Sequence, residues 1–297
     1  MQTSLCATLN AMDDLRYECA TIEWEALERS KYVGRIAPSP TGLLHLGHAR
    51  TFWAANYRCG ATKGTMWLRN EDLDPQRSKQ EYVDAMRGDL QWLGITWDRE
   101  LTQSERMEAY REAMQQLLAS GHVFACNCSR KDLLQAIQAP HEDTDDEPIY
   151  NGRCRCNTTR TLEANTNYRF RVPDDERIAF VDGHCGPQSF LAGTTSEADF
   201  GDFLVWRKDG LPSYQLACVV DDAFQGVTEV VRGRDLLKST ARQILLQRAL
   251  GLHTPRYFHT DLMRDANGVR LAKRHDALSL RALREQGHTP EQVLAMF

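Results

Sequence analysis

The sequence contains no hydrophobic run near the length of a membrane-spanning helix, which needs about 20 consecutive apolar residues. Residues 1–30 also lack the apolar segment of a secretory signal peptide, and they carry six acidic side chains instead. We therefore expect a cytoplasmic protein that does not associate with membranes. We expect residues 1–30 to be a loosely attached extension, or the product of a start codon placed too early.

Two further features are missing, namely a large excess of positive charge and a disulfide framework. The 297 residues carry a net charge of -5, which argues against an indiscriminate nucleic-acid binder but leaves room for a local basic groove. The cysteines number nine, an odd count, and most are scattered, which is typical of a reducing cytosol. The length suffices for one large domain or two moderate ones with a substantial core.

The most informative stretch is Arg35–Arg50, which reads RIAPSPTGLLHLGHAR. A short apolar strand leads into a turn rich in proline and glycine, and helical spacing resumes over 43–59. Such a turn directs backbone N–H groups and the positive end of a helix at one place, which suits a phosphate. On that helix His45 and His48 would share a face, and Gly47 between them leaves room for a flat ring.

Two histidines at this spacing are by themselves more often ordinary surface or core residues than a site. With the Pro-Ser-Pro-Thr-Gly turn directly in front, the stretch resembles the His-Ile-Gly-His motif of the class I aminoacyl-tRNA synthetases. The preceding Arg-x-Ala-Pro-Ser-Pro-Thr-Gly pattern is similar to that of the glutamyl and glutaminyl branch. The resemblance covers residues 32–297 and implies that the chain activates an amino acid with ATP.

An acidic turn follows a buried strand at 66–68. Glu71, Asp72 and Asp74 would lie at the carboxyl end of that strand, where open parallel sheets bind their ligands. The spacing alone is equally consistent with a solvated acidic turn. The resemblance to the glutamyl synthetases implies that Glu71 helps to hold the amino group of the substrate.

Two Cys-x-Cys pairs, Cys126/Cys128 and Cys154/Cys156, flank a polar and acidic stretch. Thiols concentrated in this way in a cytosolic protein indicate structural zinc, with disulfides or inert thiols as alternatives. The compact relatives of glutamyl-tRNA synthetase carry Cys-x-Cys followed by Tyr-x-Gly-x-Cys. The resemblance therefore implies that zinc is bound by Cys126, Cys128, Tyr150 and Cys154, with Cys156 as an alternative to the tyrosine.

The later part of the chain places polar residues beside apolar segments. We expect strands over 203–206, 227–231 and 257–263, antiparallel strands within 168–190, and helices over 214–224 and 235–250. Arg232 directly follows one of these strands, where an arginine binds a carboxylate with two hydrogen bonds or forms a surface salt bridge. The resemblance implies that Tyr214 and Arg232 contact bound glutamate.

Residues 270–276 read RLAKRHD, and alone they would indicate a solvated basic loop. Behind the other motifs they resemble the Lys-Met-Ser-Lys-Ser loop of the family, which implies that Lys273 meets the departing pyrophosphate. Arg270 keeps the first positive charge of that loop but not its geometry. Ala272 replaces the serine, so we expect somewhat weaker ATP handling.

The resemblance implies an α/β protein with a Rossmann-like class I synthetase catalytic domain, an inserted zinc-bearing α+β subdomain and a short C-terminal helical segment. The expected divisions are an N-terminal extension 1–30, the two halves of the catalytic domain 31–125 and 200–250, the inserted acceptor and zinc subdomain 126–199, and a C-terminal subdomain 251–297 with the lysine loop. In the family the insertion holds the acceptor end of tRNA. We expect no anticodon-binding domain.

The chemistry implied is attack of a glutamate carboxylate on the α-phosphorus of ATP, which depends on positioning and on charge neutralisation. By resemblance the catalytic residues are His45, His48 and Lys273, and ATP would contact these three and Gly47. Mg²⁺ is expected with ATP. The expected glutamate pocket comprises Arg35, Ile36, Ala37, Pro38, Ser39, Glu71, Tyr214 and Arg232.

The compact, zinc-bearing relatives without an anticodon domain are the glutamyl-Q tRNA(Asp) synthetases. The resemblance implies transfer of glutamate to queuosine at the wobble position of tRNA(Asp), an exposed loop base that can be splayed into a pocket. The alternatives are a truncated enzyme that charges the 3′ end of tRNA(Glu), and a catalytically degenerate paralogue that binds RNA. We expect a monomer whose partners are ATP, L-glutamate and the queuosine-bearing anticodon stem-loop of tRNA(Asp).

Overall fold

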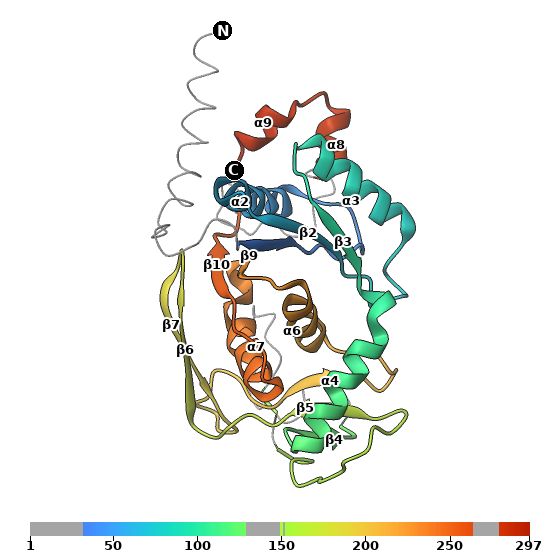
Figure 1. Cartoon of the computed structure of the whole chain (residues 1–297), viewed down its shortest axis with the longest axis vertical. Coiled ribbons are helices and arrows are strands. Elements are labelled where there is room, and N and C mark those ends of the chain that lie inside the picture. Colours follow the sequence, from blue (N-terminus) through green and yellow to red (C-terminus); the bar gives the residue numbers. More distant parts are fainter. Residues whose placement is uncertain (1–31, 129–148, 151, 264–278) are drawn as a thin grey trace.

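The computed structural model describes residues 32–128, 149–150, 152–263 and 279–297 (Figure 1). The expected extension 1–30 lies outside these residues. Within the described part of the chain, no helix combines the length and the apolar character needed to cross a bilayer.

A parallel sheet forms the middle of the molecule. Its strands are, in spatial order, β3 (Arg99–Thr102), β2 (Thr65–Asn70), β1 (Val33–Ile36), β9 (Glu229–Gly233) and β10 (Arg256–Thr260). β1 pairs with β2, β2 with β3 and β9 with β10, in each case in parallel.

Thr228 joins the two groups of strands. Its N–H donates to the carbonyl oxygen of Val33 at 2.9 Å, and Val33 N–H donates to Thr228 Oγ1 at 3.0 Å. Two residues further along β1, Arg35 reaches the carbonyl oxygen of Val231, so β1 and β9 advance in the same direction. The order of the five strands is that of doubly wound nucleotide-binding folds, and it confirms the expected α/β class. The strand order reverses between β1 and β9, where such folds bind ligands.

Helices cover both faces of this sheet. They are α2 (Leu46–Thr62), α3 (Gln80–Trp92), α4 (Met107–Ser120), α6 (Tyr214–Gln225), α7 (Leu237–Leu250), α8 (Leu280–Glu285) and α9 (Pro290–Leu294), with short 3₁₀ turns η3 (Gln103–Arg106) and η4 (Arg234–Leu236). Val230 and Val231, adjacent on β9, enter different hydrophobic clusters, because successive side chains of a strand point to opposite faces. One cluster contains α4, α6 and α7, and the other contains α2, α3 and α8.

The remaining strands lie outside this row of five. β4 (Val123–Cys126), β5 (Asn167–Phe170) and β8 (Phe203–Trp206) form a separate antiparallel sheet. β6 (Glu176–Asp182) and β7 (Gly186–Ala192) form an antiparallel hairpin along one side of the molecule (Figure 1). β6 also pairs in parallel with β10, through Asp182 and Tyr257.

Most of the expected elements are confirmed, with shifted ends. The strand 203–206 and the helix from Tyr214 are found where the pattern predicts them, and 168–190 contains the expected antiparallel pairing. The strand predicted over 227–231 begins two residues later, because the preceding Thr228 already bonds to β1. The expected boundaries at 126 and 199 stay a prediction, since β5 shares its sheet with β8, and β6 pairs with β10.

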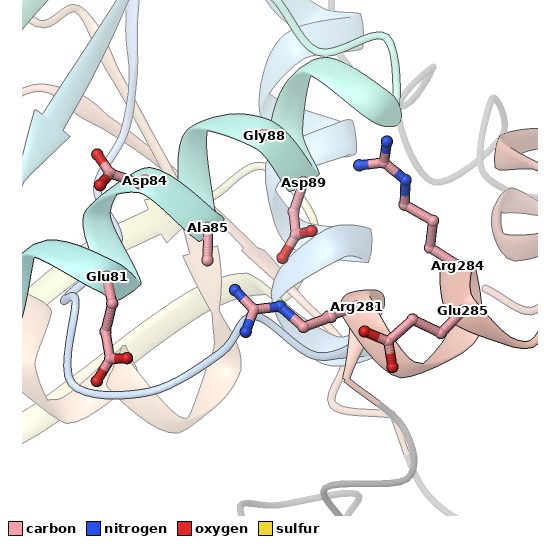
Figure 2. A pocket seen from close by; sticks show the side chains of 8 residues that line it. All are labelled: Glu81, Asp84, Ala85, Gly88, Asp89, Arg281, Arg284 and Glu285. Atoms are coloured by element: carbon pink, nitrogen blue, oxygen red, sulfur yellow. The ribbon is translucent and has the colours of Figure 1, made fainter.

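Acidic and basic side chains line a groove between α3 and α8 (Figure 2). Asp89 on α3 lines it together with Arg281 and Arg284 on α8. The Asp89 side chain is buried, and its Oδ2 has no hydrogen-bond partner among the described residues. Burial raises the pKa of Asp89 to about 6, although the two arginines act in the opposite direction.

We expect Asp89→Asn to stabilise the protein at pH 8. The folded state binds the Asp89 proton more tightly than the unfolded chain does, so ionisation of Asp89 costs folding free energy as the pH rises from about 4 to about 6 and above. The gain from the substitution should therefore shrink as the pH is lowered through 6 towards 4, as measured by urea unfolding. Asp84→Asn on the same helix, at a side chain that is 65% exposed, is the control. A gain from Asp89→Asn that does not change with pH would contradict the assignment.

Candidate functional site

The loops after β1 and β2 meet at the carboxyl edge of the sheet. β1 ends at Ile36, and Glu71 follows the end of β2. Glu71 N–H donates to the carbonyl oxygen of Pro38 at 3.1 Å, and Thr41 N–H donates to that of Ser39 at 2.8 Å. The turn after β1 is thereby held against the acidic turn after β2, as the motif spacing predicts.

The two histidines of the motif lie against each other. The rings of His45 and His48 stack with centroids 3.8 Å apart, and His45 N–H donates to His48 Nδ1 at 3.4 Å. The predicted helix start at residue 43 is wrong, because α2 begins at Leu46 and His45 is its extended N-cap residue. The two rings nevertheless share one side of the helix end, since the N-cap and the third helical residue face each other.

Gly47 leaves space beside this pair. A methyl group added at its Cα would come 3.4 Å from the His45 ring, and no other described group outside the neighbouring helix backbone lies within 4 Å of it. A planar ligand can therefore approach the first turn of α2. Backbone N–H groups at this helix end favour a negatively charged group.

The chain on both sides of 264–278 is attached to the start of α2. Leu280 N–H donates to the carbonyl oxygen of Leu44 at 2.8 Å, and Ser279 pairs with His45. On the other side, Arg50 Nη1 donates to the carbonyl oxygen of Asp261 at 3.2 Å. The predicted loop residues Arg270, Ala272 and Lys273 themselves lie outside the described residues.

Four charged side chains form a buried cluster beside this edge. Asp222 of α6 pairs with Arg69 at 2.5 Å and with Arg35 at 3.3 Å, and Arg69 also pairs with Glu71 at 3.1 Å. Arg35 Nη1 donates to the carbonyl oxygen of Val231 on β9 at 2.9 Å. The cluster therefore connects β1, β2, β9 and α6.

The pKa values of the two carboxyl groups differ. Burial would raise the pKa of Asp222, but Arg69 and Arg35 hold it below the usual value. Burial keeps the pKa of Glu71 above the usual value in spite of the same two arginines. The Glu71 carboxylate is therefore incompletely compensated, and an additional cation beside it would be favourable.

Arg232 is buried, with 4% of its surface exposed, and it forms no hydrogen bond or ion pair with a carboxylate among the described residues. Asp222 lies close enough to raise the pKa of Arg232 electrostatically, but its own ion pairs are with Arg69 and Arg35. The guanidinium donates to Gln243 Oε1 at 2.8 Å, to Thr240 Oγ1 at 2.7 Å, to His259 Nε2 at 3.2 Å and to Tyr214 OH at 3.5 Å. A buried cation whose direct hydrogen-bond partners are all neutral, and whose nearest carboxylate is shared with two other arginines, retains an attraction for an anion.

The predicted glutamate residues are brought to one region, with one qualification. Tyr214 starts α6 and contacts Arg232, and Cys218, one turn later, contacts Glu71 Oε1 at 3.5 Å. Ile36 stays a prediction, and because its side chain is fully buried in the core, any contact with a ligand would have to come from its backbone. Ala37 is half-buried and Ser39 is exposed in that turn.

Sequence reasoning missed three residues of this region. Arg69 and Asp222 were not identified, although an acidic residue inside an otherwise apolar helix is a signal for a buried ion pair. His259 was not identified because it lies in the middle of a predicted buried strand. Arg69 and Asp222 are 153 residues apart, and His259 and Asp182 are 77 residues apart, so that spacing does not reveal these contacts.

The cysteine pairs supply a second cluster, near β4. The sulfur atoms of Cys126, Cys128 and Cys154 all lie within 4.8 Å of one another, and those of Cys128 and Cys154 are 3.7 Å apart. The buried Tyr150 places its hydroxyl 3.5 Å from Cys126 Sγ and 3.6 Å from Cys128 Sγ. The described cysteines are free, and Cys156 is exposed and outside the cluster.

This cluster has the dimensions of a metal site. Two thiolates at about 2.3 Å from a tetrahedral ion are about 3.8 Å apart, which matches the spacing of Cys128 and Cys154. A disulfide would need about 2.05 Å instead. Three sulfur atoms and one phenolic oxygen could therefore hold a metal ion.

Comparisons with protein families and with known proteins all match this chain to synthetases and ligases of the same type. The family model described as tRNA synthetases class I (E and Q), catalytic domain, matches residues 31–297. A protein of Symbiobacterium thermophilum named glutamyl-Q tRNA(Asp) synthetase is 45% identical, and the match covers 88% of this chain and 84% of that protein. A protein of Aquifex aeolicus named glutamate–tRNA ligase is 41% identical over 89% of this chain but only 56% of its own length.

A solved structure supports the same relationship. The glutamate tRNA ligase of Elizabethkingia meningosepticum in complex with its amino acid superposes with a TM-score of 0.69 at 28% identity. The match covers 84% of this chain and 53% of that one, so this chain spans about half the length of the solved ligase.

We expect Asp222→Asn to destabilise the protein by about 3–5 kcal/mol, because it leaves two buried guanidinium groups with one carboxylate. Asp74→Asn is the matched control, since it breaks an ion pair with Arg77 that is largely exposed and should cost less than about 1 kcal/mol. Urea unfolding of both variants measures the difference. Equal losses would show that the buried cluster contributes no more than a surface pair.

Proposed function

Because the chain belongs to the tRNA synthetase class I (E and Q) catalytic-domain family, we propose that it activates glutamate with ATP to form glutamyl-adenylate, without the help of tRNA. Relatives in this family are named synthetases and ligases, and class I synthetases use ATP with Mg²⁺. The family supplies the reaction type. The amino-acid substrate is argued from the charges at the carboxyl edge of the sheet.

The main support for glutamate as the substrate is the buried Arg232, whose direct hydrogen-bond partners among the described residues are all neutral. A carboxylate of the substrate would complete this site, with Tyr214 beside it to orient the group. Arg35 uses Nε and Nη1 in the cluster, and its Nη2 has no partner among the described residues. Two available cationic positions suit an amino acid with two carboxylates and suit glutamine poorly. The incompletely compensated Glu71 would receive the ammonium group.

The activation step needs positioning more than covalent chemistry. The glutamate carboxylate attacks the α-phosphorus of ATP, and pyrophosphate leaves. His45, His48 and the N–H groups at the start of α2 would stabilise the charge that develops on the phosphorus centre. Gly47 would admit the nucleotide, and Lys273 would meet the departing pyrophosphate. The role of Lys273 rests on the motif and on the attachment of Asp261 and Ser279 to α2.

The metal of the cysteine cluster is proposed to be zinc, bound by Cys126, Cys128, Tyr150 and Cys154. Thiolate ligands select zinc over magnesium or calcium. When bound, the ion would fix the segment after β4 without taking part in the reaction. The exclusion of Cys156 from the cluster supports the tyrosine as the fourth ligand.

For the second step we propose transfer of glutamate to queuosine in tRNA(Asp). The names of relatives that this chain matches over most of both lengths support this acceptor. Charging of the 3′ end of tRNA(Glu) is the second candidate, supported by relatives named glutamate–tRNA ligase. A degenerate RNA-binding paralogue has only Arg270 and Ala272 in its favour.

The proposed reaction predicts ATP–pyrophosphate exchange that depends on glutamate, ignores glutamine and needs no tRNA. Radiolabelled glutamate should then appear on tRNA(Asp) that contains queuosine and not on tRNA(Asp) that lacks it. Removal of the 3′-terminal adenosine separates the two acceptors, because transfer to the 3′ end requires the diol of that ribose, whereas the diol of queuosine stays intact. Exchange without any glutamate dependence would refute the activation step, and label on tRNA(Glu) would favour the second candidate.

The zinc proposal predicts about one zinc per chain in protein that has never met a chelator. Cys154→Ser should lose most of this zinc, because it removes a ligand of the cluster. Cys156→Ser, two residues away and exposed, should keep it. Elemental analysis of the purified variants decides between them, and loss of zinc from Cys156→Ser would assign the fourth ligand to that thiol.

A further inference from the structure

Arg232 is the first member of a buried chain of three side chains. Its Nε donates to His259 Nε2 at 3.2 Å, and His259 Nδ1 lies 2.6 Å from Asp182 Oδ2. Asp182 and His259 are fully buried side chains. The three residues come from the ends of β9, β10 and β6, so the chain crosses from the central sheet to the β6–β7 hairpin.

The direction of the hydrogen bonds is fixed by Arg232. A guanidinium can only donate, so the Nε2 of His259 must accept and the single ring proton of neutral His259 must lie on Nδ1. Burial, with Arg232 adding to it, lowers the pKa of His259, which keeps the ring neutral. Hydrogen bonds, first that of His259, lower the pKa of Asp182 to about 2 against its burial, so Asp182 is an anionic acceptor for the Nδ1 proton.

The other oxygen of Asp182 holds the turn of the hairpin. Oδ1 accepts from the backbone N–H groups of His184 at 3.0 Å, of Cys185 at 2.8 Å and of His259 at 3.2 Å. The carboxylate therefore has a fixed orientation, with Oδ1 committed to three backbone donors and Oδ2 to the imidazole. No rotation of the group can exchange these roles without the loss of several hydrogen bonds.

We propose that Asp182 and His259 are positioning residues that hold the Arg232 guanidinium in place to bind the substrate carboxylate. This inference rests on the proposed function, in which Arg232 binds glutamate. Asp182 fixes the tautomer of His259, and His259 fixes the plane of the guanidinium together with Gln243 and Thr240. The hairpin, which lies far along the chain from Arg232, thereby takes part in amino-acid recognition.

Asp182→Asn tests the tautomer directly. Its Oδ1 would stay with the three backbone donors, so its amide NH₂ would face His259 Nδ1 and move the ring proton to Nε2. The His259 Nε2–H would then face the Arg232 Nε–H donor and could donate only to Thr240 Oγ1, 3.1 Å away, so the hydrogen bond from Arg232 would be lost. We expect the KM for glutamate in ATP–pyrophosphate exchange to rise about tenfold or more, with the KM for ATP unchanged.

Glu229→Gln is the matched control. Glu229 is also a buried carboxylate, bonded to Arg58 and Tyr32, and it lies on β9 three residues before Arg232. It should lose stability without a change in the KM for glutamate. An equal rise in both variants, or no rise in Asp182→Asn, would overturn the inference.

A second pair of variants covers the case in which Asp182→Asn does not fold. His259→Gln keeps an oxygen that can accept from Arg232, whereas His259→Leu has a similar volume and no acceptor. We expect the KM for glutamate to rise in His259→Leu at least tenfold more than in His259→Gln. Equal values would overturn the inference, whereas a wild-type protein without glutamate-dependent exchange would overturn the proposed function instead.

Discussion

The site depends on a buried guanidinium, that of Arg232, which forms no hydrogen bond or ion pair with a carboxylate among the described residues. Arg35, Arg58 and Arg69 are also buried arginines of the central sheet region, and each pairs with an acidic side chain. Arg232 differs from them, because its hydrogen bonds go to an amide, a hydroxyl, an imidazole and a phenol among the described residues. Burial of such a cation costs free energy. The position is therefore better explained by an anionic ligand than by stability.

The remaining charges of the region pair mainly with one another, although Asp222 also acts on Arg232 electrostatically. Asp222 satisfies Arg69 and part of Arg35, and so it draws β1, β2 and α6 together beside the point where the strand order reverses. Glu71 remains the carboxylate with the raised pKa. A substrate with an ammonium group near Glu71 and a carboxylate near Arg232 would improve both. The region thus contains paired charges that support the fold and incompletely paired ones that the proposed function assigns to substrate binding.

Sequence reasoning predicted the elements better than the contacts between them. The strand, turn and helix at 35–50, the helix from Tyr214 and the clustered cysteines follow local patterns, which a single sequence displays, whereas Tyr150 beside the cysteines was implied by the family resemblance. The start of α2 was missed because His45 takes an extended N-cap conformation that its helical spacing with His48 does not reveal. The contacts of Arg69 with Asp222, 153 residues away, and of Asp182 with His259, 77 residues away, depend on strand order, which local patterns do not encode.

Strand order also explains why so many distant segments meet at one edge. Because all five central strands run in parallel, each one ends at the same edge of the sheet. The residue after each strand therefore lies at that edge as a result of strand direction alone. Three backbone or side-chain contacts near the start of α2 then bring in segments that are not strands. Leu280 N–H donates to the Leu44 carbonyl oxygen, Ser279 pairs with His45, and Arg50 donates to the Asp261 carbonyl oxygen. The first turn of α2 is consequently fixed from two sides, by chain that precedes and follows residues 264–278. Under the proposed function, a helix end that is held in this way would bind the nucleotide at a fixed position relative to Asp261 and Ser279, and therefore to the chain on both sides of residues 264–278.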